Sequence, residues 1–182
     1  MQLITPTLIY NDINLMQNAV NTIVQEATWG NLNQIGLNYR INAVNKWTDA
    51  TGNFYQSDSP CFGAKESDFT QLNNIPQYLK ESILNLKLKL NINLGRIRIM
   101  KLLPRRGLSV HADLEIRYHF VIETNTKSFF CFNTNNDEYL GIKANCYHLP
   151  MDGQWYKVDT TKTHWVYNGG DSPRIHLVVC AI

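Results

Sequence analysis

The second half of this chain is a succession of short β-type runs with no helical segment between them. From Gly95 onward, apolar and β-branched residues gather at 96–103, 114–122, 128–133, 154–159, 162–167 and 174–181. The breaks between these runs are rich in turn-forming residues, as in Asn133–Asp137 and Asn168–Ser172. Strands that follow one another without crossover helices pack as antiparallel sheets. A β-sandwich or jelly roll is therefore predicted for this half of the chain.

The first half of the chain carries helical periodicity. Residues 13–28 place apolar side chains at helical spacing, with Asn11 or Asp12 available as the N-cap. A second helix is expected to begin near Pro76, because proline is favoured in the first turn, and to continue to about Leu90. Each helix is predicted to bury one face.

These patterns predict a mainly β fold with flanking helices (α+β) in a single domain. The 182 residues fit one domain with a sizeable core. We expect a helical and mixed part over residues 1–94, in which 33–40 and 53–63 are short strands and loops. A double-stranded β-helix, or jelly roll, is expected over 95–182.

Composition excludes some classes of partner. Hydrophobic residues make up 44% and charged residues 18% of the chain, and the formal charge is only +2. Such a charge does not indicate nucleic acid or a membrane surface as a partner. No Lys or Arg precedes Arg40 and no apolar run is long enough to span a bilayer, so a cytoplasmic location is expected.

The cysteines are widely spaced and form no CxxC motif. This spacing is typical of free thiols in a reducing compartment, and no disulfide is expected. They are Cys61, Cys131, Cys146 and Cys180.

Four residues in the second half suggest chemistry. His111, Asp113 and His164 supply two imidazoles and one carboxylate, the facial ligand set of a mononuclear non-haem Fe(II) site. In an extended strand, His111 and Asp113 would point to the same side because they are two residues apart. Arg174 offers a planar fork for a carboxylate, and the far end of 2-oxoglutarate is the obvious candidate. Together these residues indicate an oxygenase.

Each of these assignments has a structural alternative. The histidines could be core residues bonded to backbone carbonyls, and Asp113 could cap a turn. Arg174 could form a surface ion pair with Asp171 or Asp159. A hairpin formed by 162–167 and 174–181 is expected to bring His164 close to Arg174.

Two further strands combine polar and apolar residues. Arg117 and His119 share one face of the run 114–122, and Arg174 and His176 share one face of the last run. Such side chains are costly to bury without partners, so they indicate a ligand, a buried network or a polar outer face. We interpret His176 as a structural neighbour outside the site.

The order and spacing of these residues resemble a known family. The segments are His111-x-Asp113, Arg117-x-His119, His164-Trp165-Val166-Tyr167-Asn168 and Arg174-Ile175-His176-Leu177-Val178. This pattern, over roughly residues 95–182, is similar to the aspartyl/asparaginyl β-hydroxylase family within the cupin-fold Fe(II)/2-oxoglutarate dioxygenases.

The resemblance implies roles for individual residues. His111, Asp113 and His164 would be the iron ligands, while Arg117, His119 and Arg174 would hold 2-oxoglutarate. Some family members have glycine in place of the carboxylate ligand, whereas Asp113 completes the triad here. Met100 stands where some members place a serine that touches the cosubstrate.

The resemblance also implies a hydroxylase that acts on an amino acid or a peptidyl Asp/Asn-type side chain. Lysines and arginines within residues 87–106 are interpreted as a solvated face and not as a nucleic-acid site. Arg98 is the exception: it shares a strand face with Met100 and could bind an anionic substrate. A non-oxygenase metal-dependent cupin enzyme and a metal-free jelly-roll binding module remain alternatives.

Overall fold

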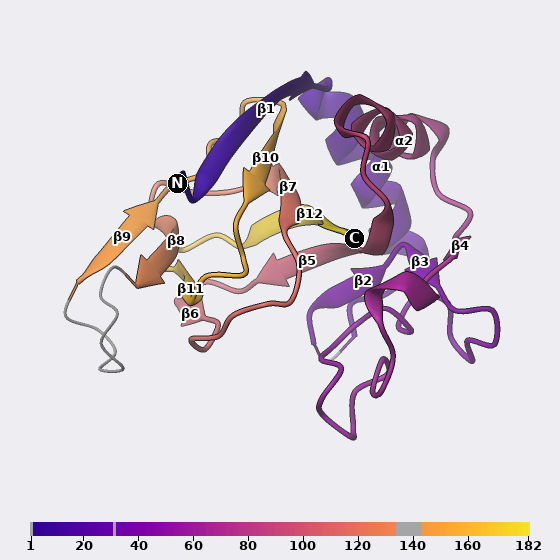
Figure 1. Ribbon diagram of the computed structural model, residues 1–182. Helices are drawn as coiled ribbons and strands as arrows, with labels where there is room; N and C mark the ends of the chain where they lie inside the picture. Colours follow the sequence, from indigo (N-terminus) through magenta and orange to yellow (C-terminus); the bar gives the residue numbers. More distant parts are fainter. Residues whose placement is uncertain (1, 31, 134–142) are drawn as a thin grey trace.

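The computed structural model describes residues 2–30, 32–133 and 143–182, and two antiparallel sheets dominate it (Figure 1). The larger, six-stranded sheet has the order β1-β10-β7-β12-β5-β2. Its strands are β1 (Ile4–Tyr10), β2 (Gln34–Gly36), β5 (Leu94–Leu102), β7 (Arg117–Glu123), β10 (Gln154–Val158) and β12 (Arg174–Ala181). This architecture confirms the mainly β, jelly-roll prediction.

The smaller sheet has four strands in the order β6-β11-β8-β9. They are β6 (Arg106–Gly107), β8 (Ser128–Asn133), β9 (Ala144–Tyr147) and β11 (His164–Asn168). A short ribbon of β3 (Asn38–Tyr39) and β4 (Gln71–Leu72) and the 3-10 helix η1 (Glu66–Asp68) lie beside β5. Most of the predicted break Asn133–Asp137 lies outside the described residues.

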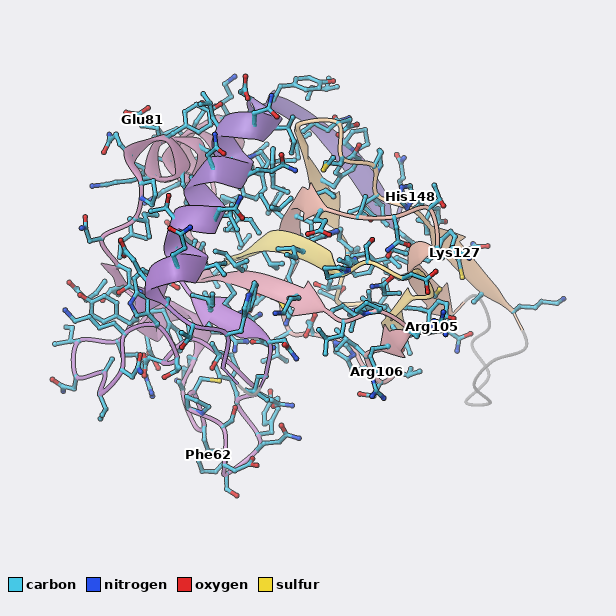
Figure 2. All side chains as sticks on the ribbon, turned by 180° about the vertical axis from the view of Figure 1, so that it is seen from behind. Phe62, Glu81, Arg105, Arg106, Lys127 and His148 are labelled. Atoms are coloured by element: carbon cyan, nitrogen blue, oxygen red, sulfur yellow. The ribbon has the colours of Figure 1, made fainter. Side chains whose placement is uncertain are left out.

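Two helices, α1 (Ile13–Glu26) and α2 (Gln77–Leu90), cover one face of the larger sheet in the described part of the chain (Figure 1). The predicted N-cap is Asp12, whose carboxylate accepts a hydrogen bond from the Leu15 amide at 3.0 Å. Side chains from both helices and the sheet fill the space between them (Figure 2). Both predicted helices are confirmed.

The two faces of the larger sheet differ in chemistry because side chains alternate along a strand. Ile97, Ile99, Phe120 and Leu177 belong to the apolar core beneath the helices. Their sequence neighbours face the smaller sheet, where polar and apolar residues mix. This opposite face carries Arg98, His119, Arg174 and His176, all buried.

Two expectations are corrected by the structure, and one strand was not expected. β11 and β12 do not form a hairpin: β11 pairs with β6 and β8, whereas β12 pairs with β5 and β7. The turn at Asn168 therefore crosses from one sheet to the other. The predicted strand 114–122 begins only at Arg117. Strand β1 was not predicted, since only Ile9 is buried in it.

The first 94 residues also contribute to the core sheet. β1 and β2 are its two edge strands, paired with β10 and β5 respectively. The short strands expected within 33–40 are β2 and β3, whereas 53–63 contains neither a helix nor a strand. Among the described helices, none has the length and apolar character needed to cross a membrane.

Candidate metal centre

His111, Asp113 and His164 come together where the two sheets meet. The backbones of His111 and His164 form a bridge, with N–H to O distances of 3.0 and 2.8 Å. The Asp113 amide donates to the Thr160 carbonyl at 2.8 Å, which fixes the third residue beside them. The potential ligand atoms of the three side chains all lie within 4.8 Å of one another. The predicted triad is therefore assembled in space.

Backbone carbonyls determine which imidazole nitrogen faces the centre. Nδ1 of His111 lies 2.7 Å from the Ser109 carbonyl, and Nδ1 of His164 lies 2.9 Å from the Lys162 carbonyl. A carbonyl only accepts, so each neutral ring carries its proton on Nδ1 and a lone pair on Nε2. Both Nε2 atoms face Asp113, at 3.8 and 3.7 Å from its carboxylate oxygens. Burial lowers the pKa of His164, which favours this neutral form.

The carboxylate of Asp113 is only partly satisfied by protein atoms. Arg117 donates to its Oδ1 at 2.5 Å, whereas Oδ2 is buried and has no hydrogen-bond partner. Burying a carboxylate oxygen without a hydrogen-bond partner costs free energy of folding. Two imidazole lone pairs and this oxygen converge on one point, so the donor set fits a divalent transition metal such as Fe(II).

A cavity between the sheets adjoins the triad and contains a buried arginine. His111 and His164 line it together with Arg117, His119 and Arg174. The remaining lining is mainly apolar: Leu32, Met100, Leu102, Leu108, Phe130, Val166 and Val178, with Gln34, Lys101 and Thr160. The cavity has a volume of about 50 Å³, and its lining suits an anionic group.

Arg174 has no counter-charge within the described residues. It is 6% exposed, and its guanidinium carbon lies 4.9 Å from the centre of the Phe130 ring. Burial alone lowers its pKa to about 9. The surface alternative is excluded, because Asp171 pairs with Arg105 and Asp159 bonds Thr161. A buried cation without a counter-charge destabilises the fold, so binding of an anion at Arg174 would be favourable.

The two buried histidines beside Arg174 form a chain of contacts. Nη2 of Arg174 lies 3.1 Å from Nδ1 of His176, which lies 3.4 Å from Nδ1 of His119. Arginine only donates, so Nδ1 of His176 is an acceptor. Burial, and then the charge of Arg174, hold the pKa of both histidines well below the usual value. The Nε2 atoms of both rings have no hydrogen-bond partner among the residues described.

Arg117 connects the triad to two cavities. Besides binding Asp113, it lines both the cavity of Arg174 and a second cavity, and His111 also lines both. Its Nε is buried without a partner. The sequence prediction that Arg117 and His119 share a face is confirmed, while their contact with a cosubstrate stays a prediction.

The second cavity has a volume of about 510 Å³ and contains another unpaired arginine. Arg98 is 2% exposed, and its side-chain contacts with the described residues are long: 3.3 Å from Nη1 to Oε1 of Gln34 and 3.9 Å from Nη2 to Sγ of Cys180. Burial, then the charges of Arg96 and Arg117, lower its pKa to about 10. His111 and Asp113 also line this cavity.

Arg96 corrects the interpretation of residues 87–106 as a solvated face. It is 3% exposed and forms a buried salt bridge with Glu66, with 2.8 Å between Nη2 and Oε1. Arg96 differs from Arg98 in having a counter-charge, the carboxylate of Glu66 in η1. Because Glu66 is far from Arg96 in the sequence, the local sequence pattern could not predict this pair.

Several lining residues could not be predicted. Gln34 and Phe130 reach the cavities from strands that had no functional signal in the sequence. His176 did have a signal, as a polar residue two positions after Arg174 in an apolar strand. It was placed outside the site, yet it directly contacts Arg174 and lies next to His119.

Comparison with solved structures supports the fold. A 2OG-Fe(II) oxygenase family oxidoreductase from Burkholderia pseudomallei is 14% identical, with a TM-score of 0.57 over 98% of this chain and 82% of that chain. A Pseudomonas putida prolyl-4-hydroxylase is 8% identical, with a TM-score of 0.50 over 100% and 92% of the two chains. At such low identity these similarities establish a shared fold.

A third solved structure, a nickel complex of the non-heme monooxygenase ThoJ, is 12% identical, with a TM-score of 0.51 over 99% of this chain and 73% of that chain. No functionally curated protein matches the sequence.

Comparison with protein families is more specific. The family described as Aspartyl/Asparaginyl beta-hydroxylase matches residues 62–182, which is most of the chain. The match begins before Gly95, the start of the segment in which the sequence pattern resembles the family, and it includes η1, α2 and the entire triad. The chain therefore belongs to the aspartyl/asparaginyl β-hydroxylase family and is a hydroxylase.

Proposed function

We propose that this protein uses Fe(II) and 2-oxoglutarate to hydroxylate an amino acid or a peptidyl Asp/Asn-type side chain. The observation that carries the proposal is Arg174, a buried cation that has no counter-charge among the described residues and lines the same cavity as His111 and His164. A dicarboxylate cosubstrate would supply the missing anion at the required place.

In this proposal the triad holds the metal. His111 and His164 would bind Fe(II) through Nε2 and Asp113 through its unpartnered Oδ2. The bound iron would supply the activation of O₂ that hydroxylation of a C–H bond requires. Arg117 would keep the Asp113 carboxylate oriented, because it donates to the other oxygen.

The cavity residues would orient the cosubstrate. Arg174 would hold its distal carboxylate with two parallel hydrogen bonds, and Phe130 beneath the guanidinium keeps the fork in place. His176 accepts from Arg174, so it leaves the other guanidinium donors for the ligand. His119, with an unpartnered Nε2, would be the second cosubstrate contact.

The substrate would occupy the second cavity. Arg98 supplies a buried positive charge there, on the same side as His111 and Asp113. A substrate carboxylate bound to Arg98 would set which carbon faces the metal. We therefore propose that Arg98, which shares a strand face with Met100, binds a carboxylate of the substrate.

The test is succinate formation from 2-oxoglutarate in the presence of Fe(II), measured across free amino acids and Asp- or Asn-containing peptides. We expect at least one carboxylate-bearing substrate to stimulate turnover. Absence of 2-oxoglutarate turnover by the iron-loaded protein would favour a non-oxygenase cupin enzyme, and absence of iron binding would favour a binding module.

The same assay tests Arg98. Arg98→Ala should raise KM for the substrate, or uncouple succinate release from hydroxylation, with little change in cosubstrate binding. Arg106→Ala is the matched control, because this arginine is exposed and lines neither cavity. Coupled turnover at the parental KM would remove Arg98 from the substrate site.

A further inference from the structure

Two cysteines far apart in the sequence face each other across the smaller sheet. β8 and β9 run antiparallel, and the register pairs Cys131 directly with Cys146. Their Sγ atoms lie 2.6 Å apart. Directly opposite residues of an antiparallel pair have Cα atoms about 4.5–5.5 Å apart, which lies within the range that a disulfide spans. The register thus brings two free thiols into bonding range.

The two thiols differ in accessibility. Cys146 is exposed on β9, an edge strand of the sheet, whereas Cys131 is 5% exposed. Burial raises the pKa of the Cys131 thiol to about 12, so it is protonated at neutral pH. A reagent in solution would therefore meet Cys146 first, and Cys131 would react second from within the protein.

The other two cysteines have different surroundings. Cys61 and Cys180 are both buried. Sγ of Cys61 lies near Ser59 and Arg96, and Sγ of Cys180 lies near Arg98. Neither has a cysteine neighbour among its described contacts, so these two residues provide internal controls.

We propose that Cys131 and Cys146 are a reversible redox site that takes a small disulfide oxidant, such as oxidised glutathione, and becomes an intramolecular disulfide. The Cys146 thiolate attacks one sulfur of the oxidant, and one glutathione thiolate leaves. Cys131 then loses its proton and attacks Sγ of Cys146, which expels the second glutathione. The two cysteines lose two hydrogen atoms and two glutathione thiols form, so atoms and electrons balance.

The disulfide would join two strands without entering the metal cavity. Phe130 and Phe132 flank Cys131 in β8, and their rings lie 6.1 and 5.8 Å from the His164 ring. Side chains alternate along a strand, so Cys131 points to the opposite face of the sheet. Oxidation would tie β9 to β8 and, through β8, to the strand that begins with His164.

The experiment treats the full-length protein, chelated and anaerobic, with oxidised glutathione and then alkylates the remaining thiols. The expected result is a mass loss of two hydrogen atoms, with a cross-linked peptide that contains Cys131 and Cys146. Reduction by dithiothreitol should restore both thiols. A parent protein that keeps four alkylatable thiols, or that links Cys61 or Cys180 instead, would overturn the proposal.

Variants define the order of the steps. Cys131→Ser should trap one glutathione on Cys146, Cys146→Ser should remain unmodified, and Cys61→Ser should form the same cross-link as the parent. If Cys131→Ser does not fold, the peptide map of the oxidised parent still decides whether the pair forms. Equal glutathione labelling of the Cys146→Ser and Cys131→Ser variants would contradict the role of Cys146.

Discussion

At the scale of single residues, hydrogen bonds to the backbone prepare the histidines for a metal. The carbonyls of Ser109 and Lys162 hold the protons of His111 and His164 on Nδ1, so both Nε2 lone pairs face Asp113. An imidazole bonded in this way is oriented before any ion arrives. The orientation depends on main-chain atoms, and therefore on the local fold around each histidine.

The first prediction concerns these ligands. His111→Ala and His164→Ala should each weaken Fe(II) binding by more than about 100-fold, because even removal of a ligand's hydrogen-bond partner costs roughly 10–100-fold. Anaerobic Fe(II) titration is the measurement, with circular dichroism to verify the fold. His148→Ala is the control, since this exposed histidine lies outside the triad (Figure 2). Parental iron affinity in both triad variants would refute the assignment.

The second prediction concerns the shape of the charge at Arg174. Arg174→Lys keeps the positive charge but loses the planar fork, so binding of 2-oxoglutarate should weaken by about 1–3 kcal/mol. Iron affinity should stay the same. Anaerobic titration of the cosubstrate measures the change, with Arg105→Lys, an exposed residue paired with Asp171, as the control. An unchanged dissociation constant would exclude Arg174 from the site.

The third prediction concerns the buried histidines His119 and His176. Burial lowers the pKa of both below the usual value of 6.5, so they are neutral in the folded protein. Below about pH 6.5 the unfolded chain binds more protons than the folded one, and stability is lost as the pH falls towards the folded-state pKa values. Each histidine contributes at most about 1.4 kcal/mol per pH unit.

Urea unfolding of the metal-free protein at several values between pH 7.5 and 5 measures this effect. The free energy of unfolding should decrease on the acid side, and His176→Asn should make the decrease shallower. If the variant and the parent lose stability in parallel, His176 does not contribute to the pH dependence.

At the scale of elements, the crossover from β11 to β12 decides how the site is built. Asn168, fully buried, is the last residue of β11 and organises the turn that follows. Its Nδ2 lies 3.2, 3.2 and 2.9 Å from the carbonyls of Leu102, Leu103 and Ser172. Its Oδ1 accepts from Ser128 and Asn125. These bonds connect the end of β5, the start of β8 and the turn before β12.

The fourth prediction follows from this network. Asn168→Ala should reduce the free energy of unfolding by about 2–4 kcal/mol, because several buried polar groups lose their partner at once. Cosubstrate binding should also weaken, since the turn positions Arg174. Urea unfolding provides the measurement, and Asn21→Ala on the exposed face of α1 should change stability by no more than about 0.5 kcal/mol. A similarly small effect at Asn168 would show that the turn does not depend on the network.

At the scale of the whole molecule, the two halves of the chain share one core. α1 and α2 pack on a sheet whose inner strands come from the second half and whose edges, β1 and β2, come from the first. We therefore propose that residues 1–182 form a single domain, with the mixed segment 1–94 and the β core 95–182 dependent on each other.

The fifth prediction tests this dependence. Unfolding in urea should be one transition, with the same midpoint by fluorescence of Trp155, buried in β10, as by far-ultraviolet circular dichroism. Trp155→Phe identifies the share of the fluorescence signal that comes from this residue. Two separated transitions would show that the helical part and the β core unfold independently.

The local sequence pattern was sufficient to predict both helices, most strands and the candidate metal ligands. Helical spacing and an N-cap predicted α1 and α2, and alternating apolar runs predicted most strands, because these signals depend on neighbours in the sequence. His111, Asp113 and His164 could also be predicted as metal ligands from the sequence, because a metal site needs specific residue types. The family match over residues 62–182 agrees with that reading.

Only the tertiary structure decided which strands pair and which charges find a partner. β11 and β12 are neighbours in sequence but belong to different sheets, because contacts of Asn168 with distant carbonyls favour a crossover over a hairpin. Arg96 and Arg98 look equivalent in sequence, yet in the part of the chain that the structure describes Arg96 pairs with the carboxylate of Glu66 and Arg98 pairs with no carboxylate. Pairing across a sheet joins residues far apart in the chain, as with Cys131 and Cys146, and a sequence pattern reports only on near neighbours.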